Sequence, residues 1–123
     1  MRVESLYSVD PGLDIPIYQQ LRDQIVMGIS DGALAPGEQL PTVRALAEEI
    51  GVNVMTVSKA YQLLKQEGYI YSDRRSGARV REKFSDTKTL TDGSLEQLKK
   101  IVSEAKISGM SKEDFFAMCE ELF

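Results

Sequence analysis

The sequence predicts a mainly helical chain with one small β-hairpin and a helical C-terminal tail, and three observations support this fold class. Apolar residues recur at helical spacing in three segments between residues 14 and 67. Two short strand-like runs, 69–72 and 78–81, flank turn-forming residues at 73–77. Beyond residue 94, after a polar stretch, helical periodicity returns. We therefore expect a helical core, a hairpin and a tail.

The first helix is expected to begin after Asp14, whose carboxylate can accept hydrogen bonds at a helix N-terminus, with Pro16 in the first turn. This helix is expected to end between residues 30 and 32, and Pro36 and Gly37 then predict a tight turn. Its apolar stripe comprises Ile17, Tyr18, Leu21, Ile25 and Ile29.

Two shorter helices follow, joined by a glycine turn. Thr42 is expected to cap a helix over residues 43–50, and Gly51 to supply the turn. Asn53 is expected to cap a helix that runs to about Glu67, before Gly68 stops it. The residues expected to face inward are Leu46, Ala47, Ile50, Val57, Ala60, Tyr61 and Leu64. Together with the hairpin this order predicts a winged helix-turn-helix, in which the later helix is the recognition helix and the hairpin is the wing.

The chain is expected to divide into a winged helix-turn-helix domain at residues 1–83, a linker at 84–93 and a helical tail at 94–123. Ser94 and Gln97 have the spacing of a capping box at the start of the tail. Gly109 breaks the first tail helix, and Ser111 with Asp114 begins the last one.

Composition excludes several classes of protein. With 42% apolar and 28% charged residues over 123 positions, the chain is expected to be globular. It has no histidine and a single cysteine, so a zinc site, a histidine acid–base mechanism and an intramolecular disulfide lack their residues. We expect no metal, no cofactor and no enzymatic activity. The sequence has neither an apolar run near the ~20 residues of a membrane helix nor an apolar secretion signal, so we expect a cytoplasmic protein that does not contact a membrane.

The net charge of −4 is unevenly distributed. Between residues 40 and 83 there are eight Lys or Arg and five Asp or Glu, so the helix-turn-helix and wing carry a modest basic excess. Nucleic-acid binding depends on such basic side chains, which neutralise phosphates and release counterions. An excess of this size is also common on ordinary solvated surfaces, so charge alone does not decide the function.

The segment LPTVRALAEEIGVNVMTVSKAYQLLKQEGYI, residues 40–70, resembles the DNA-binding domain of the GntR family of bacterial regulators. The preceding PIYQQLRDQIVMGISDGALAPGEQ resembles the family's first helix and turn, and RRSGARV resembles its wing. The tail of about forty residues is too short for the large effector domains of other branches and is similar to that of the YtrA-type branch. The resemblance implies a transcription regulator that binds double-stranded operator DNA.

The resemblance also implies which residues contact DNA. They lie at the start of the second helix, along the start of the recognition helix and at the wing tip: Thr42, Arg44, Asn53, Val54, Met55, Thr56, Ser58, Lys59, Arg74, Arg75, Ser76 and Gly77. Val54 and Met55 depart from the polar residues that are frequent there, and apolar side chains cannot hydrogen-bond guanine but can contact a thymine methyl. Arg75 replaces a wing glycine, and Asp73 stands where a basic residue is common. Without the resemblance, Arg44 would be interpreted as a surface ion pair with Glu48.

The tail presents more apolar surface than an isolated pair of helices can bury, which favours an interface between two copies of the chain. The residues expected there are Leu95, Leu98, Ile101, Val102, Phe115, Phe116, Met118, Leu122 and Phe123. The alternative is that the tail packs back on the first helix of its own subunit.

These predictions point to a dimeric repressor that binds a palindromic operator. Two other classes remain: a sensor that binds a small-molecule effector between the tail helices, and a winged-helix module that binds protein. The tail sequence shows no convergent polar residues that would mark an effector site. A protein-binding module would lack salt-dependent binding to DNA.

Overall fold

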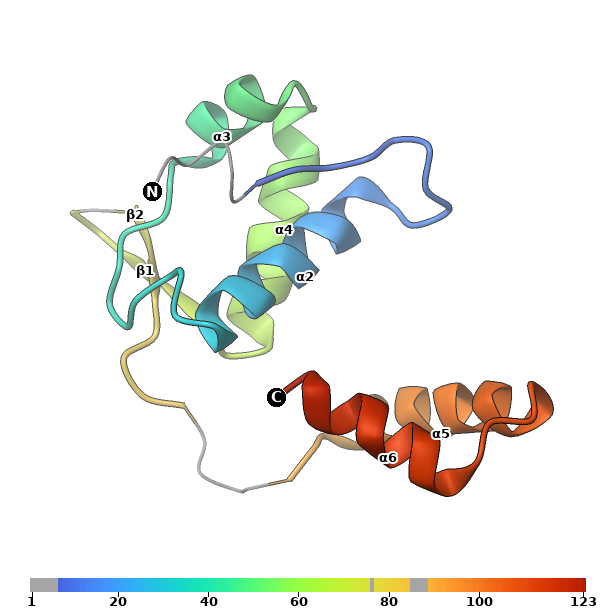
Figure 1. Ribbon diagram of the computed structural model, residues 1–123. Helices are drawn as coiled ribbons and strands as arrows, with labels where there is room; N and C mark the ends of the chain where they lie inside the picture. The colour runs from blue at the N-terminus through green and yellow to red at the C-terminus, as the bar shows by residue number, and fades with distance from the viewer. Residues whose placement is uncertain (1–6, 76, 85–88) are drawn as a thin grey trace. The chain divides into compact units, whose positions relative to one another are not determined.

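The computed structural model describes residues 7–75, 77–84 and 89–123 (Figure 1). The chain forms two compact units, residues 1–85 and residues 86–123. The first unit contains the helices α2 (Ile17–Ser30), α3 (Val43–Ile50) and α4 (Val54–Gln66) and the hairpin of β1 (Ile70–Asp73) and β2 (Gly77–Val80). The second contains α5 (Asp92–Ile107) and α6 (Lys112–Glu121). The predicted fold class, mainly helical with a two-stranded antiparallel hairpin, is confirmed.

The core of the first unit lies where α2, α3 and β1 pack on α4 (Figure 1). Most residues expected to face inward are buried, whereas Tyr18, Ile29 and Ile50 are only partly buried at the edge of the core. Ile17, the first residue of the predicted stripe, is also only partly buried and does not belong to the core. The buried apolar side chains of this unit are Tyr7, Leu21, Ile25, Leu34, Leu40, Leu46, Ala47, Val57, Ala60, Tyr61, Leu64, Ile70 and Val80. Burying a leucine or isoleucine side chain contributes ~1.5–3 kcal/mol, so we expect this unit to fold without the tail.

The caps of α3 and α4 are those that the sequence predicts. The Oγ1 atom of Thr42 accepts the Ala45 N–H at 3.0 Å, and the Oδ1 atom of Asn53 accepts the Met55 N–H at 2.7 Å. Gly51 ends α3 with φ 71°, a left-handed conformation that glycine adopts without strain.

The predicted cap of α2 is wrong. Pro16, not Asp14, holds the N-cap position, and no side chain caps this helix. The Gln19 and Gln20 N–H groups bond to the Pro16 carbonyl, so the helix starts at Ile17, too far along the chain for the Asp14 carboxylate to serve as the cap. The incoming segment is held instead by the buried side chain of Gln20, which accepts the Asp10 N–H and donates to the carbonyls of Asp10 and Ile15.

The two strands are shifted by one residue toward the tip relative to the predicted runs. The antiparallel register pairs Ile70 with Val80 and Asp73 with Gly77. Tyr69 falls outside β1 because its N–H bonds to Leu64 at the end of α4. The other edge of β2 is also paired, since residues 37–40 exchange backbone hydrogen bonds with Ala78 and Val80. Residues 37–40 therefore hold the wing in place through backbone hydrogen bonds to β2.

The start of the tail also differs from the prediction. Thr91, not Ser94, caps α5, because its Oγ1 accepts the Ser94 N–H at 3.1 Å. The predicted capping box is therefore wrong, and α5 begins at Asp92, inside the stretch expected to be linker. The second turn is confirmed: Gly109 has φ 85°, and the Oγ of Ser111 accepts the Asp114 N–H at 3.1 Å.

Within residues 7–75, 77–84 and 89–123, no helix is long and apolar enough to cross a membrane. Over the same residues, no group of three or more acidic or cysteine side chains is placed to hold a metal ion.

A charged cluster joins the middle of α2 to the end of α4. Arg22 donates to both carboxylate oxygens of Glu67, at 2.8 and 3.0 Å, and to Asp23 at 2.9 Å. The guanidinium carbon of Arg22 also lies 5.6 Å from the centroid of the Tyr69 ring. A two-pronged contact of this kind is stronger than a single ion pair because the planar guanidinium fits the carboxylate.

We expect Arg22→Gln to lower the free energy of unfolding by about 1 kcal/mol, since the pair is partly exposed and therefore screened by solvent. Lys99→Gln is the matched control because it removes an exposed pair with Glu96 and should change the stability very little. Urea unfolding followed by circular dichroism measures both variants. Equal stabilities would show that the Arg22 cluster does not hold α2 to α4.

Candidate nucleic-acid interface

The start of α3 presents Thr42 and Arg44 to solvent, while Leu46 and Ala47 anchor the same helix in the core. The Thr42 hydroxyl oxygen already accepts the Ala45 N–H, so its hydrogen remains available for an outside acceptor. Among the described residues, Arg44 makes no ion pair with Glu48, so the alternative role predicted for it is not seen. Arg44 is therefore an exposed guanidinium beside a helix N-terminus.

The first turn of α4 is exposed, although two of its side chains are apolar. Val54 is 43% and Met55 73% exposed, whereas Val57, in the next turn of the helix, is fully buried. Asn53 is exposed next to them, and Thr56 and Ser58 are partly buried on the same helix. Val54 and Met55 are exposed apolar side chains among polar neighbours, so they can contact an apolar group of a ligand.

Lys59 extends from α4 toward α2. Its Nζ lies 4.1 Å from the centroid of the Tyr18 ring, a cation–π contact that fixes the ammonium near the first turn of α2. Sequence reasoning assigned Tyr18 only to the apolar stripe and missed this contact. The contact depends on how α2 crosses α4, and helical periodicity carries no information about that.

A buried tyrosine links α4 to the chain just before α3. The Tyr61 hydroxyl donates to the carbonyl of Pro41 at 2.7 Å, one residue before the Thr42 cap. Burial raises the pKa of Tyr61, so the hydroxyl stays protonated and remains a donor. This bond couples the recognition helix to the residues at the start of α3.

The wing places Arg74 and Arg75 in solvent. The Oδ1 atom of Asp73 accepts the Arg75 N–H at 2.9 Å, and its Oδ2 atom lies 3.5 Å from the Nε atom of Arg79. Asp73, the acidic departure noted in the sequence, thus shapes the turn and pairs inside the hairpin. Gly77 has φ 80°, so a residue with a side chain would be strained there. Ser76, the remaining predicted wing residue, lies outside the described residues.

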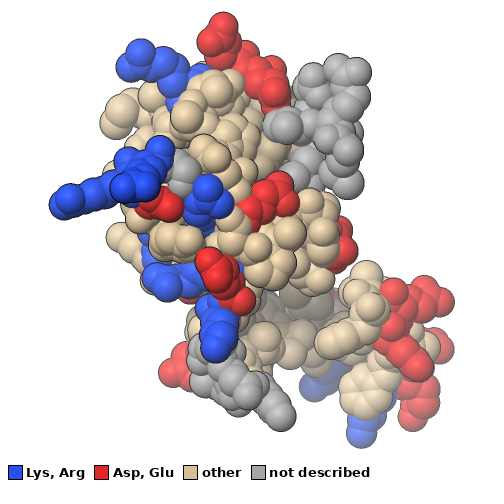
Figure 2. Space-filling view, turned by 90° about the vertical axis from the view of Figure 1, so that its left-hand side faces the viewer, with Lys and Arg blue, Asp and Glu red and all other residues tan. Residues whose placement is uncertain are grey.

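Arg79 ties the wing to the segment before α3, because its Nη1 atom donates to the Gly37 carbonyl at 2.7 Å. Figure 2 shows Lys and Arg side chains projecting from this face with acidic side chains between them. The basic character of the surface is therefore local, in agreement with the modest excess counted from the sequence.

The residues predicted for dimerisation lie in a unit with no buried residue in either helix. Val102 and Phe115 are partly buried, and the other seven are exposed. Among the predicted residues that lie within α5 or α6, Phe116 is the most exposed, at 60%. The isolated tail therefore leaves its apolar side chains open to contact.

Comparisons with known proteins cover nearly the whole chain, including both units. Residues 17–80, from α2 to β2, match the family model described as bacterial regulatory proteins, gntR family. The chain is 35% identical to the HTH-type transcriptional repressor YtrA of Bacillus subtilis (strain 168), over 95% of this chain and 92% of that protein. It is similar in structure to a transcriptional antiterminator from Listeria monocytogenes EGD-e, with a TM-score of 0.81 and 28% identity over 94% of this chain and 88% of that one.

The chain is also similar to AraR(DBD) in a crystal structure with operator ORX1. The TM-score is 0.54 with 29% identity, over 61% of this chain and 95% of that one. The matching part of the chain is thus similar to a domain that has been crystallised with operator DNA.

Proposed function

Because the chain belongs to the gntR family of bacterial regulatory proteins, we propose that it is a repressor that binds a palindromic operator as a homodimer. The observation that carries the proposal is the exposure of Asn53, Val54 and Met55 at the start of α4 and of Arg44 in the first turn of α3. In a helix-turn-helix protein the N-terminal residues of this helix contact base edges in the major groove.

Arg44 of α3 and the apolar side chains Val54 and Met55 of α4 recognise different bases. A guanidinium can donate two hydrogen bonds to the O6 and N7 atoms of guanine. Val54 and Met55 have no such donors, and the C5-methyl group of thymine is the apolar feature that the major groove offers. We therefore propose half-sites with a G·C pair opposite Arg44 and A·T pairs opposite Val54 and Met55.

The polar residues around these positions contact phosphates. Thr42 and Asn53 lie at helix N-termini, where exposed N–H groups and the helix dipole favour an anion. Thr56 and Ser58 offer hydroxyl donors along α4, and Lys59 brings a positive charge beside Tyr18. Such contacts fix the register of α4 on the duplex without reading the sequence.

The wing adds a contact that does not depend on sequence. We expect Arg74→Ala/Arg75→Ala to weaken binding to all DNA sequences and to reduce the slope of log K against log salt by about one to two, because each phosphate contact contributes about 0.9 to it. The control is Lys99→Ala/Lys100→Ala, which removes the same charge from α5 of the second unit. Salt titrations by fluorescence anisotropy measure both variants. If the wing variant keeps the wild-type slope, the wing does not contact DNA.

Dimerisation uses the exposed apolar side chains of α5 and α6. A single winged helix reads one half-site, whereas two copies related by a two-fold axis read a palindrome. Analytical ultracentrifugation of the full chain tests this state directly, and a monomer at micromolar concentration would contradict it.

Selection of bound sequences from a random DNA pool tests the proposal as a whole. The expected product is an inverted repeat whose half-sites contain the G·C and A·T positions proposed above. Selected sequences without any common motif would contradict sequence-specific regulation, and a single half-site would contradict the dimer. A protein-binding module would select nothing, and its interaction with DNA would show no salt dependence.

A further inference from the structure

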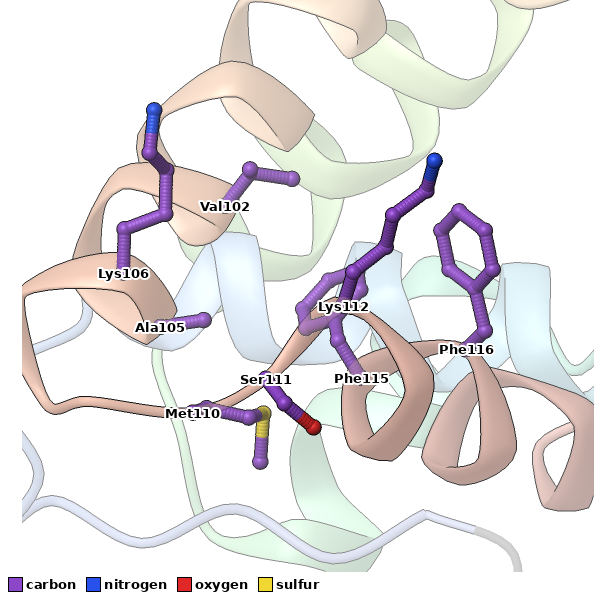
Figure 3. A pocket seen from close by; sticks show the side chains of 8 residues that line it. All are labelled: Val102, Ala105, Lys106, Met110, Ser111, Lys112, Phe115 and Phe116. Carbon is purple, nitrogen blue, oxygen red and sulfur yellow. The ribbon is translucent and has the colours of Figure 1, made fainter.

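The second unit contains a cavity between its two helices, which the proposed DNA contacts do not use. Its volume is about 390 Å³, within the ~300–1,000 Å³ typical of small-molecule sites. Its walls are mostly apolar and come from the end of α5, the turn and the start of α6 (Figure 3). The side chains on its apolar walls are Val102, Ala105, Met110, Phe115 and Phe116.

Two lysines lie at the edge of this cavity. Lys106 is in the last turn of α5 and Lys112 in the first turn of α6, and the Gly109 turn brings these two helix ends together. In Figure 3 both side chains extend in the same direction, on either side of Val102. The Nζ atom of Lys112 lies 5.5 Å from the centroid of the Phe116 ring, which holds this ammonium beside the apolar wall.

Neither ammonium forms an ion pair within the described part of the chain, although α6 has two acidic residues in its first turn. An apolar cavity edged by two unpaired positive charges complements a molecule with an apolar body and an anionic head. Sequence reasoning found no convergent polar residues in the tail. The two lysines edge the same cavity only because the chain reverses direction between them.

We propose that this cavity binds a small amphipathic anion, with its carboxylate or phosphate head at Lys106 and Lys112 and its apolar body against Phe115 and Val102. Val102, Phe115 and Phe116 also belong to the proposed dimer interface, so the bound anion would change how two copies associate. That regulatory consequence rests on the proposed function, whereas the binding itself does not.

Isothermal titration calorimetry of the full chain, without DNA, tests the binding. The probes are octanoate and octyl phosphate. Two controls separate the parts of the ligand: 1-octanol has the apolar body without a charge, and acetate has the anionic head without the apolar body. We expect both amphipathic anions to bind, the neutral alcohol to bind at least about tenfold more weakly, and acetate not to bind. Whichever anion binds more tightly identifies the preferred head group.

Lys106→Gln/Lys112→Gln should weaken binding of the better anion at least about tenfold, because the variant loses both charges but keeps the cavity. The matched control is Lys100→Gln, because Lys100 is also an exposed lysine of α5 but does not line the cavity; this variant should bind like the wild type. Ala105→Phe keeps both lysines and fills the cavity, and it should also abolish binding. Circular dichroism checks that each variant is folded.

Three results would overturn the proposal. Equal binding of octanol and octanoate would mean an apolar cavity without selectivity for anions. Unchanged affinity in the double lysine variant would mean that the anion binds elsewhere. No binding of either anion to a chain that sediments as a dimer would mean that a second copy fills the cavity. Because these measurements use no DNA, failure here leaves the proposed operator binding untouched.

Discussion

A chain that ends after Lys83 is expected to be a folded monomer with ~10²–10⁴-fold lower affinity for a two-half-site operator than the full chain. The truncated chain keeps every buried apolar side chain of the described residues, since all of these lie between Tyr7 and Val80. It loses the tail that we propose joins two copies. Once one subunit of a dimer is bound, the second half-site is met at a high effective concentration, and this advantage disappears in the monomer.

Sedimentation velocity and DNA titration on both chains measure this effect. A second pair of variants keeps the full length: Leu98→Glu/Ile101→Glu places charges on the exposed apolar face of α5, and Lys100→Glu is the control on the same helix. The first should behave like the truncated chain and the second like the wild type. A truncated chain that stays dimeric, or binds a palindrome as tightly as the full chain, would place the interface in the first unit.

Arg44→Ala is expected to weaken binding to the selected operator by ~1–3 kcal/mol, about 5- to 150-fold, with a much smaller effect on unrelated DNA. The reason is geometric, because an exposed guanidinium in the first turn of α3 can donate two hydrogen bonds to one guanine. Specificity should therefore relax at that base pair. The fold should be unchanged, since Arg44 makes no ion pair with Glu48 in the described residues.

Arg44→Lys separates the two roles that this side chain could have. Lysine keeps the charge but loses the planar fork, so it should restore non-specific binding and not the preference for guanine. Lys65→Ala, at the far end of α4, controls for the loss of one positive charge. Competition titrations with operator and mutated operator give the specificity ratio. If Arg44→Ala leaves that ratio unchanged, Arg44 contacts a phosphate and another residue reads the base.

The sequence by itself determined the features that depend on neighbours a few residues away. Thr42, Asn53 and Ser111 cap helices because a short polar side chain reaches N–H groups two or three residues ahead. Gly51 and Gly109 end helices because only glycine enters the left-handed region without strain. Helical periodicity likewise identifies which face of α4 is buried. Where two local signals competed, as for Thr91 and Ser94, the sequence pattern predicted the wrong cap.

Only the tertiary structure decided the contacts between residues that are far apart in the chain or that meet across a turn. The Arg22–Glu67 pair, the Tyr61 bond to Pro41 and the Lys59–Tyr18 contact all depend on how α2 and α3 cross α4. The bracing of β2 by residues 37–40 depends on which edge of the hairpin is open. Periodicity shows which face of a helix is apolar but not which residue lies opposite it. For the same reason, periodicity alone does not show that Lys106 and Lys112 line one cavity between α5 and α6.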